Sequence, residues 1–168
     1  MQYLSHYDSP MGRMTMAAED GALVGLWFDG QKYFASTIDG ETEEAELPVF
    51  EDTKRWLDIY YAGRCPDFVP KIELKGSTFR KRVWDSLIRI PYGKVITYND
   101  IAKEIAAERG LKSMSAQAVG GAVGHNPISV IVPCHRVVGS DGSLTGYAGG
   151  VEKKETLLRL EREACSSV

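Results

Sequence analysis

The sequence contains few cysteines and no long apolar segment. The first observation argues against a disulfide-rich protein and the second against a membrane-spanning one. Its 168 residues include 3 cysteines, none of which lies in a CxxC pair. So small and odd a number of cysteines does not make a disulfide framework. No apolar run approaches the ~18 residues that a membrane helix requires, and the N-terminus lacks the pattern of a signal peptide. We therefore expect a cytoplasmic protein that does not associate with a membrane.

Residues that bind metals are scarce as well. Cys65 has no second cysteine or histidine near it in the sequence, and His6 is equally isolated. Zinc sites need several such ligands at short spacings, so we expect neither a metal nor another cofactor. An isolated cysteine is most often a small buried apolar residue, and this is the environment we expect for Cys65. The role of Cys134 depends on its neighbours.

The charges divide the chain into two halves. Residues 1–75 contain 7 Lys/Arg and 14 Asp/Glu, whereas residues 76–168 contain 13 and 9. The prolines and glycines of AGRCPDFVPKIELKG indicate a linker that ends near Lys75, so we expect one domain over residues 1–75 and a second over residues 76–168. Nucleic acid would bind the basic second domain, although a solvated surface of mixed charge explains so mild a bias almost as well.

Local patterns predict a hairpin and a helix in the first domain and mostly helices in the second. The stretch RMTMAAEDGALVGLWF predicts two strands joined at Glu19-Asp20-Gly21, and the apolar spacing of residues 49–61 predicts a helix. In the second domain, helix caps are expected at Ser77, at Thr97 and at Ser113 or Ser115. The last two of these helices would form a helix-turn-helix.

The second helix of that pair, AQAVGGAVG, has almost no side chains. Each glycine in a helix interior costs about 1 kcal/mol relative to alanine, so the composition needs a reason. Close packing against another helix is one explanation. The other is the close approach of a large partner, such as the floor of a DNA groove.

The chemistry that the sequence suggests is concentrated at Cys134. ISVIV is typical of a buried strand, and Pro133 cannot donate to a sheet ladder, so Cys134 should leave the strand facing a cavity. The nucleophile is a thiolate, and His135 can accept the thiol proton directly or through a water. Asn126 begins an Asn-Pro turn that can brace this loop. The glycine-rich stretch that follows, with Tyr147 as its one large side chain, can fold over a flat ligand.

A partner for His135 is expected 27 residues beyond Cys134. GVEKKETLLRLE predicts a helix, and Glu161 projects from the apolar stripe of Leu157 and Leu158. A carboxylate on a core face needs a partner, and the imidazole of His135 would suit it. The alternative is that Glu161 lies at the edge of the stripe, in water.

These motifs resemble a known family. PCHRVVGSDGSLTGYAGG, the upstream AVGGAVGHNP and the downstream LLRLE are similar to the methylated-DNA–protein-cysteine methyltransferases, the O6-alkylguanine repair proteins, in their bacterial branch. The resemblance covers nearly the whole chain. It implies an RNase H-like α/β N-terminal domain and a mainly α C-terminal domain with a winged helix-turn-helix. It also implies a monomer that binds double-stranded DNA containing O6-alkylguanine, with O4-alkylthymine as a second candidate substrate.

The resemblance also assigns roles to residues. Cys134 would accept the alkyl group in a single turnover, while His135, a bound water and Glu161 relay its proton and Asn126 braces the turn. Tyr98 would help to rotate the damaged nucleotide out of the duplex. Tyr147 and the carbonyls from Val137 to Ser140 would line the guanine pocket. The DNA-binding residues would be Ala116, Gln117, Ala118, Gly120 and Arg136.

One position departs from the family pattern. An arginine commonly precedes AVGG and fills the gap left by the flipped base, but this sequence has Gln117 there. Glutamine can hydrogen-bond the orphaned cytosine but lacks the charge and the stacking plane of arginine. The connection between Tyr98 and Gln117 is also a few residues longer than in the animal proteins.

Two other functions fit parts of the sequence. A cysteine hydrolase of the Cys-His-acid type would use the same three residues, but it gives no reason for the Ala/Gly-rich helix. A DNA-binding module that marks lesions without chemistry is the second alternative, but such relatives replace the cysteine that Cys134 retains. Counting turnovers on a chromogenic ester separates the hydrolase from the alkyl acceptor.

Overall fold

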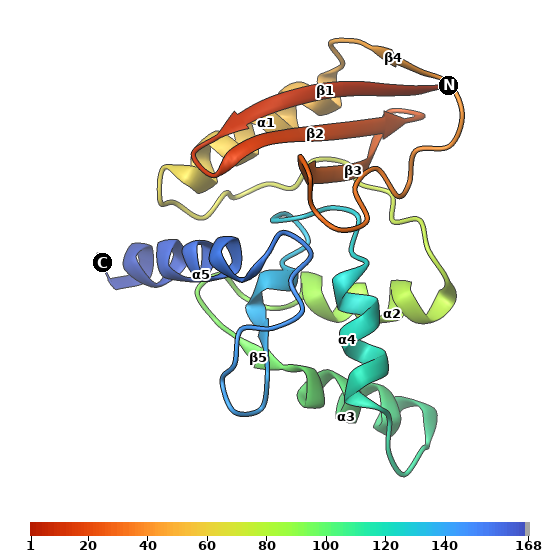
Figure 1. Ribbon diagram of the computed structural model, residues 1–168, viewed down its shortest axis with the longest axis vertical. Helices are drawn as coiled ribbons and strands as arrows, with labels where there is room; N and C mark the ends of the chain where they lie inside the picture. The colour runs from red at the N-terminus through yellow and green to blue at the C-terminus, as the bar shows by residue number, and fades with distance from the viewer. Residues whose placement is uncertain (167–168) are drawn as a thin grey trace.

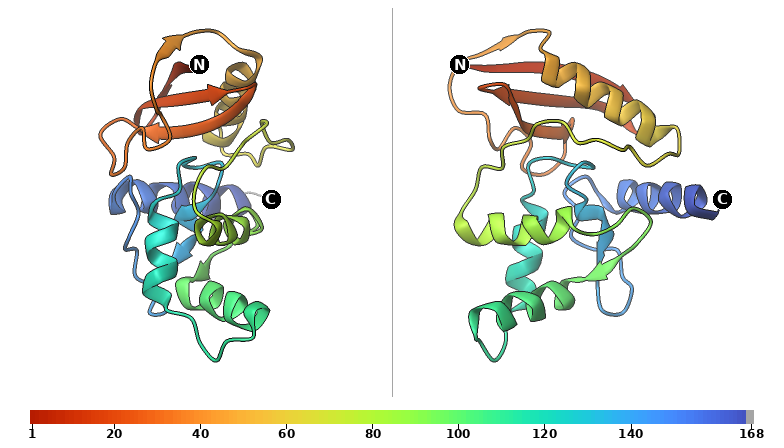
Figure 2. Two further views of the ribbon diagram at one scale, coloured as in Figure 1. Left: turned by 90° about the vertical axis from the view of Figure 1, so that its right-hand side faces the viewer. Right: turned by 180° about the vertical axis from the view of Figure 1, so that it is seen from behind.

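The computed structural model describes residues 1–166 and shows an N-terminal sheet domain stacked on a helical C-terminal domain (Figure 1). Strands β1 (Gln2–Ser9), β2 (Gly12–Glu19) and β3 (Ala22–Phe28) pair antiparallel in chain order. Strand β4 (Thr42–Glu44) pairs parallel with β1, which gives the order β3-β2-β1-β4. Helix α1 (Pro48–Tyr61) covers one face of the sheet (Figure 2).

The predicted hairpin and helix of the first domain are both present. Strands β2 and β3 are joined at Asp20 and Gly21, whose φ angles of 51° and 79° are those of a tight turn that matches the twist of the strands. Phe50 and Leu57 of α1 are fully buried in the same apolar cluster as Met16 of β2.

Within residues 76–166, the C-terminal domain has four α-helices, a short 3-10 helix and a small two-stranded sheet. The helices are α2 (Thr78–Ile88), α3 (Tyr98–Arg109), α4 (Ala116–Gly124) and α5 (Val151–Ser166), and β5 (Ile96–Thr97) pairs parallel with β6 (Val137–Val138). The side chains of Ser77, Thr97 and Ser115 each accept a hydrogen bond from the third residue of their helix, as expected of N-caps. Helices α3 and α4 form the predicted pair.

The run of residues 128–132 is buried, but it is not the strand that the sequence predicts. Only Ile128 makes a ladder contact, a single bridge to Leu26 of β3, and Val130 has a positive φ of 70°. The side chain of Asn126 explains the difference, because it accepts from the amide of Ile128 at 3.0 Å and donates to the carbonyl of Val132 at 2.8 Å. These bonds curl the run into a compact turn. Its burial comes from its position between the two domains (Figure 2).

Two further observations bear on the sequence-based expectations. Cys65 is exposed rather than buried, because it lies in the proline-containing segment that joins the domains. Among residues 1–166, no helix combines the length and the apolar character needed to cross a membrane.

Candidate active site

Cys134 is the first residue of a short 3-10 helix (Cys134–Arg136) that follows the buried turn. Its side chain is nearly enclosed, with 5% of the residue exposed. Burial raises the pKa of the thiol, whereas a hydrogen bond with Asn126 and the positive charge of Lys154 act in the opposite direction. The turn that Asn126 braces therefore does what the expected strand end would have done, since it delivers the thiol to the interior.

His135 and Glu161 form a buried pair beside Cys134. Nε2 of His135 lies 2.6 Å from Oε2 of Glu161, and only 1% of Glu161 is exposed, so the carboxylate is not at the solvent edge of its helix. Burial disfavours the charged carboxylate, but hydrogen bonds with His135 and Arg136 outweigh it and lower its pKa to about 2. The ionised Glu161 accepts a hydrogen bond from Nε2–H of His135.

The proton on Nε2 leaves the lone pair of the imidazole on Nδ1. Burial lowers the pKa of His135, so the ring is held neutral. Nδ1 is buried and has no hydrogen-bond partner among the described residues. A neutral imidazole with a free, buried lone pair can act as a proton acceptor, and His135 directly follows Cys134 in the chain.

Arg136 belongs to this cluster and not to a DNA-binding surface, which corrects the role expected from the sequence. Its Nε donates to Oε1 of Glu161 at 2.8 Å, and its Nη1 donates to the carbonyl of Ile90 at 2.8 Å. With 8% of the residue exposed, the guanidinium is turned into the protein. Because its charge is already paired with Glu161, it is not available to a phosphate.

Tyr60 and Gly93 complete the shell around Glu161, and sequence reasoning found neither. The Tyr60 hydroxyl donates to Oε2 at 2.6 Å, and the amide of Gly93 donates to Oε1 at 3.0 Å. Tyr60 lies 101 positions before Glu161, and its place in the apolar stripe of α1 marks it only as a core residue.

Lys154 is the third residue that was missed. It is fully buried and donates from Nζ to the carbonyls of Val137 at 2.5 Å and Thr145 at 3.1 Å. Burial lowers its pKa to about 8, and the nearby Cys134 opposes that effect. A signal was available, because Lys154 precedes Leu157 by three positions and therefore lies on the apolar face of its helix.

An open cavity of about 540 Å³ brings together two of the four expected substrate-binding residues and three of the five expected DNA-binding residues. Tyr98 projects into it from the start of α3, and its hydroxyl donates to the carbonyl of Thr145 at 2.7 Å. The remaining lining residues include Ala116, Gln117, Gly120 and Ser140. Cys134 and Tyr147 do not line this cavity, and Val137 is buried with its carbonyl bonded to Lys154.

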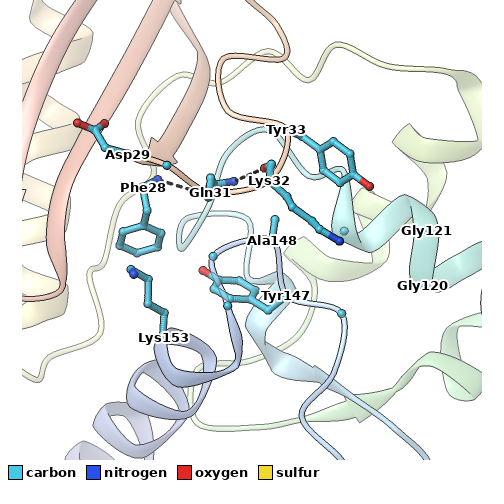
Figure 3. Close-up of a pocket in the computed structure, with 15 residues that line it drawn as sticks. Phe28, Asp29, Gln31, Lys32, Tyr33, Gly120, Gly121, Tyr147, Ala148 and Lys153 are labelled. Carbon is cyan, nitrogen blue, oxygen red and sulfur yellow. Dashed lines mark hydrogen bonds between the residues drawn. The ribbon is translucent and has the colours of Figure 1, made fainter.

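A second cavity of about 590 Å³ lies between the domains (Figure 3). The loop after β3 forms one wall, where the ring of Tyr33 stacks on His125 at 3.8 Å between centroids. The opposite wall is the loop that contains Tyr147. Gly120 and Gly121 of α4 border both cavities, so this helix separates them.

The glycines of α4 distinguish the two explanations for its small residues. A Cβ on Gly124 would lie 3.5 Å from the carbonyl of Gly146, which is a packing contact. A Cβ on Gly121 would have no described atom within 4 Å. Gln117 and Ala118 are likewise exposed. Close packing therefore accounts for the inner side of the helix and leaves its outer side unexplained by contacts within the protein.

No metal site accompanies these groups in the described chain, since residues 1–166 contain no set of three or more His, Cys, Asp or Glu placed to hold an ion. Cys134, His135, Glu161 and Asn126 form one buried cluster, and the expected DNA-contacting residues of α4 lie outside it.

Comparison with known proteins identifies the family. The models for the ribonuclease-like domain and the DNA-binding domain of 6-O-methylguanine DNA methyltransferase match residues 2–74 and residues 78–163. A methylated-DNA–protein-cysteine methyltransferase of Mycolicibacterium paratuberculosis is 44% identical over 155 residues, covering 92% of this chain and 89% of that protein. One from Methanosarcina acetivorans is 40% identical over 159 residues, covering 95% and 97%.

The solved structures agree with the sequence matches. The crystal structure of Mycobacterium tuberculosis OGT in complex with DNA has a TM-score of 0.84 at 38% identity and covers 96% of this chain and 94% of that chain. The expected architecture, a ribonuclease-like domain followed by a helical DNA-binding domain, is therefore confirmed. The chain belongs to the methylated-DNA–protein-cysteine methyltransferase family.

Proposed function

We propose that this protein repairs DNA by direct reversal, moving the alkyl group of O6-alkylguanine in double-stranded DNA to Sγ of Cys134. The sulfur attacks the alkyl carbon, the S–C bond forms as the C–O6 bond breaks, and the guanine leaves as its anion and is then protonated. A second substrate of the same chemistry is O4-alkylthymine. The observation that carries the proposal is the buried contact of 2.6 Å between His135 and Glu161, directly beside an enclosed cysteine.

The proton of the thiol has a route to His135. The two residues are adjacent in the 3-10 helix, and Nδ1 is the ring nitrogen without a protein partner. We propose that one water carries the proton from Sγ to Nδ1, because adjacent side chains do not face each other directly. Glu161 then stabilises the imidazolium through its bond to Nε2. Lys154 stabilises the thiolate by its charge and fixes the loop that begins at Val137.

The exposed side of α4 is the proposed DNA-binding surface. Ala116, Gln117, Ala118 and Gly120 would lie in the minor groove, where small side chains allow close approach. Tyr98 would press on the backbone of the damaged nucleotide as it rotates outward. Ser140 and the neighbouring carbonyls, together with Tyr147, would hold the guanine.

Several further features complete the proposal. The protein would act as a monomer in the cytoplasm, with its two domains meeting near Lys75. Because water does not hydrolyse a thioether under mild conditions, Cys134 would be consumed. Each chain would therefore repair one lesion.

The test is intact-mass analysis after incubation with duplex DNA that contains O6-methylguanine. We expect one added methyl per chain, located on Cys134 by peptide mapping. Cys134→Ala should lose the transfer completely while duplex binding is retained, and Cys65→Ala, which changes an exposed cysteine, should behave as the wild type. Methyl removal by Cys134→Ala would refute the proposal. Repeated turnover of a chromogenic ester by the wild-type chain would support the hydrolase instead.

A further inference from the structure

The hydroxyl of Tyr60 connects the ribonuclease-like domain to the relay of the other domain. Tyr60 lies in the last turn of α1 and is fully buried. Its hydroxyl donates to Oε2 of Glu161 at 2.6 Å and lies 3.4 Å from Nε2 of His135. The edge of its ring packs against the imidazole, with 6.4 Å between centroids. One side chain of the N-terminal domain thus contacts both members of the buried pair.

Glu161 does not need Tyr60 to stay in place. Arg136 holds the carboxylate through Nε at 2.8 Å and Nη2 at 3.2 Å, and the Gly93 amide donates at 3.0 Å. The Tyr60 hydroxyl is therefore an additional donor on an already fixed carboxylate. A hydrogen bond to an ionised acceptor withdraws charge from it, so it weakens the pull of Glu161 on the proton of His135.

We propose that Tyr60 is a positioning residue of the relay that limits the basicity of His135 by drawing negative charge from Glu161. The proposal rests on the proposed function, because it assigns His135 as the proton acceptor of Cys134. With Tyr60 in place, the imidazole remains neutral to lower pH and Nδ1 stays free. Without its hydroxyl, Glu161 stabilises the imidazolium more strongly, so His135 is protonated at higher pH and cannot accept the thiol proton.

The other charged and titratable groups around the pair are unchanged by this substitution. They are Arg136 beside Glu161, Tyr92 against the Arg136 guanidinium, Lys154 on α5, and Cys134 itself. Tyr60 remains a donor over the whole range, because burial and the adjacent Glu161 raise its pKa well above its usual value. A shift in the titration of His135 can therefore be attributed to the missing hydroxyl.

The experiment compares Tyr60→Phe with Tyr61→Phe. Both substitutions remove one hydroxyl from the end of the same helix, but within residues 1–166 the Tyr61 hydroxyl makes no hydrogen bond to the relay. The rate of Cys134 alkylation is measured from about pH 5 to about pH 9, where histidine titrates, with iodoacetamide and with duplex O6-methylguanine. On the acid side of the pH–rate profile the rate falls as His135 becomes protonated, and we call this part of the profile its acid limb. For Tyr60→Phe we expect the midpoint of the acid limb to shift to higher pH by roughly half to one unit. The profile of Tyr61→Phe should match that of the wild type.

Two further measurements distinguish an effect on the basicity of His135 from a general loss of structure. Fluorotyrosine at position 60 is a stronger donor of nearly the same shape, so it should move the acid limb to lower pH. In a Glu161→Gln background, Tyr60→Phe should no longer shift the limb, because the charge through which it acts is absent. The pKa of His135 measured by NMR should move with the kinetic limb in each case.

The outcomes distinguish this proposal from the underlying function. If Tyr60→Phe lowers the rate equally at all pH values, or shifts the limb no more than Tyr61→Phe, Tyr60 is structural and the proposal is overturned. A shift to lower pH would overturn it as well. If the wild-type chain does not take up the methyl group on Cys134 at all, the proposed function itself has failed.

Discussion

The surroundings of Cys134 and the outer side of α4 differ in how much charge and how many side-chain contacts they contain. Around the thiol, five donor contacts converge on the two oxygens of Glu161, and Lys154 is buried among carbonyls. On the outer side of α4, Gly121 has open space beside it and Ala118 carries only a methyl group. Charge that must act on a reacting atom is fixed in the interior. The outer side of α4, the proposed DNA-binding surface, has mostly small residues and Gln117 as its long side chain.

The largest effect is expected when the buried network is broken. Arg136→Met leaves the carboxylate of Glu161 buried without its main countercharge, which typically costs about 3–5 kcal/mol. Arg89→Met is the matched control, because Arg89 pairs with Asp85 and Glu104 at the surface, where its side chain is 56% exposed. Such pairs contribute about 1 kcal/mol or less. Urea unfolding of both variants measures the contrast, and equal losses would mean that the buried network is not a special feature.

A second test uses the pH dependence of stability. Because the pKa of Glu161 is lowered to about 2 in the folded protein, its charge stabilises the fold above the ordinary carboxyl pKa of about 4.3. That contribution is lost as the pH falls from about 4.3 toward 2. Glu161→Gln should therefore lower the free energy of unfolding by on the order of 3 kcal/mol at neutral pH, with the gap closing in acid. If the difference in the free energy of unfolding between the wild type and Glu161→Gln does not change with pH, the loss of stability comes from packing and not from the charge of Glu161.

The outer side of α4 should give the opposite result for stability. Gly121→Ala introduces a methyl group into open space and removes a helix-interior glycine, so we expect a gain of up to about 1 kcal/mol in the free energy of unfolding. The same methyl group should weaken binding to duplex DNA several-fold. Thermal unfolding and a binding titration measure the two effects. Unchanged affinity would place the DNA elsewhere on the molecule.

The smallest effect is expected at Gln117. Gln117→Arg adds a planar, charged group at the position proposed to fill the gap in the base stack, where unstacking costs a few kcal/mol. We expect repair within duplex DNA to speed up a few-fold, with the gain shrinking as salt rises, and little change for free alkylguanine. Equal acceleration on both substrates would show that Gln117 is not the inserted side chain. Slower duplex repair would mean that the longer connection before Gln117 shifts the helix in the groove.

The sequence predicts the elements of the fold well where local chemistry sets them. The caps at Ser77, Thr97 and Ser115 and the turn at Asp20-Gly21 depend on residues within a few positions of each other. The run of residues 128–132 shows the limit. Its β-branched side chains indicate burial correctly, but burial between domains is independent of strand pairing, and one amide side chain is enough to curl it.

In the candidate site, too, the sequence predicts some residues, whereas others are recognised only from contacts that the fold creates. Cys134, His135 and Glu161 were predicted together because their chemistry is recognisable and the family resemblance supplies their spacing. Arg136 was placed among the DNA-binding residues with the family resemblance, whereas its partner in the structure is a carboxylate 25 positions away. Tyr60 contacts Glu161 across the domain boundary, and a contact of this kind leaves no pattern in a single sequence.

The contact between Tyr60 and Glu161 has a consequence for how the protein is made. Helix α1 precedes α5 in the chain, so it is synthesised well before the helix that contains Glu161. Domains tend to fold as units, the N-terminal one first, so the relay can form only when α5 docks beneath a completed α1. Until then the cysteine has its histidine but lacks the carboxylate that orients it. The full set of contacts on Glu161 is therefore completed only when α5 packs against the finished N-terminal domain.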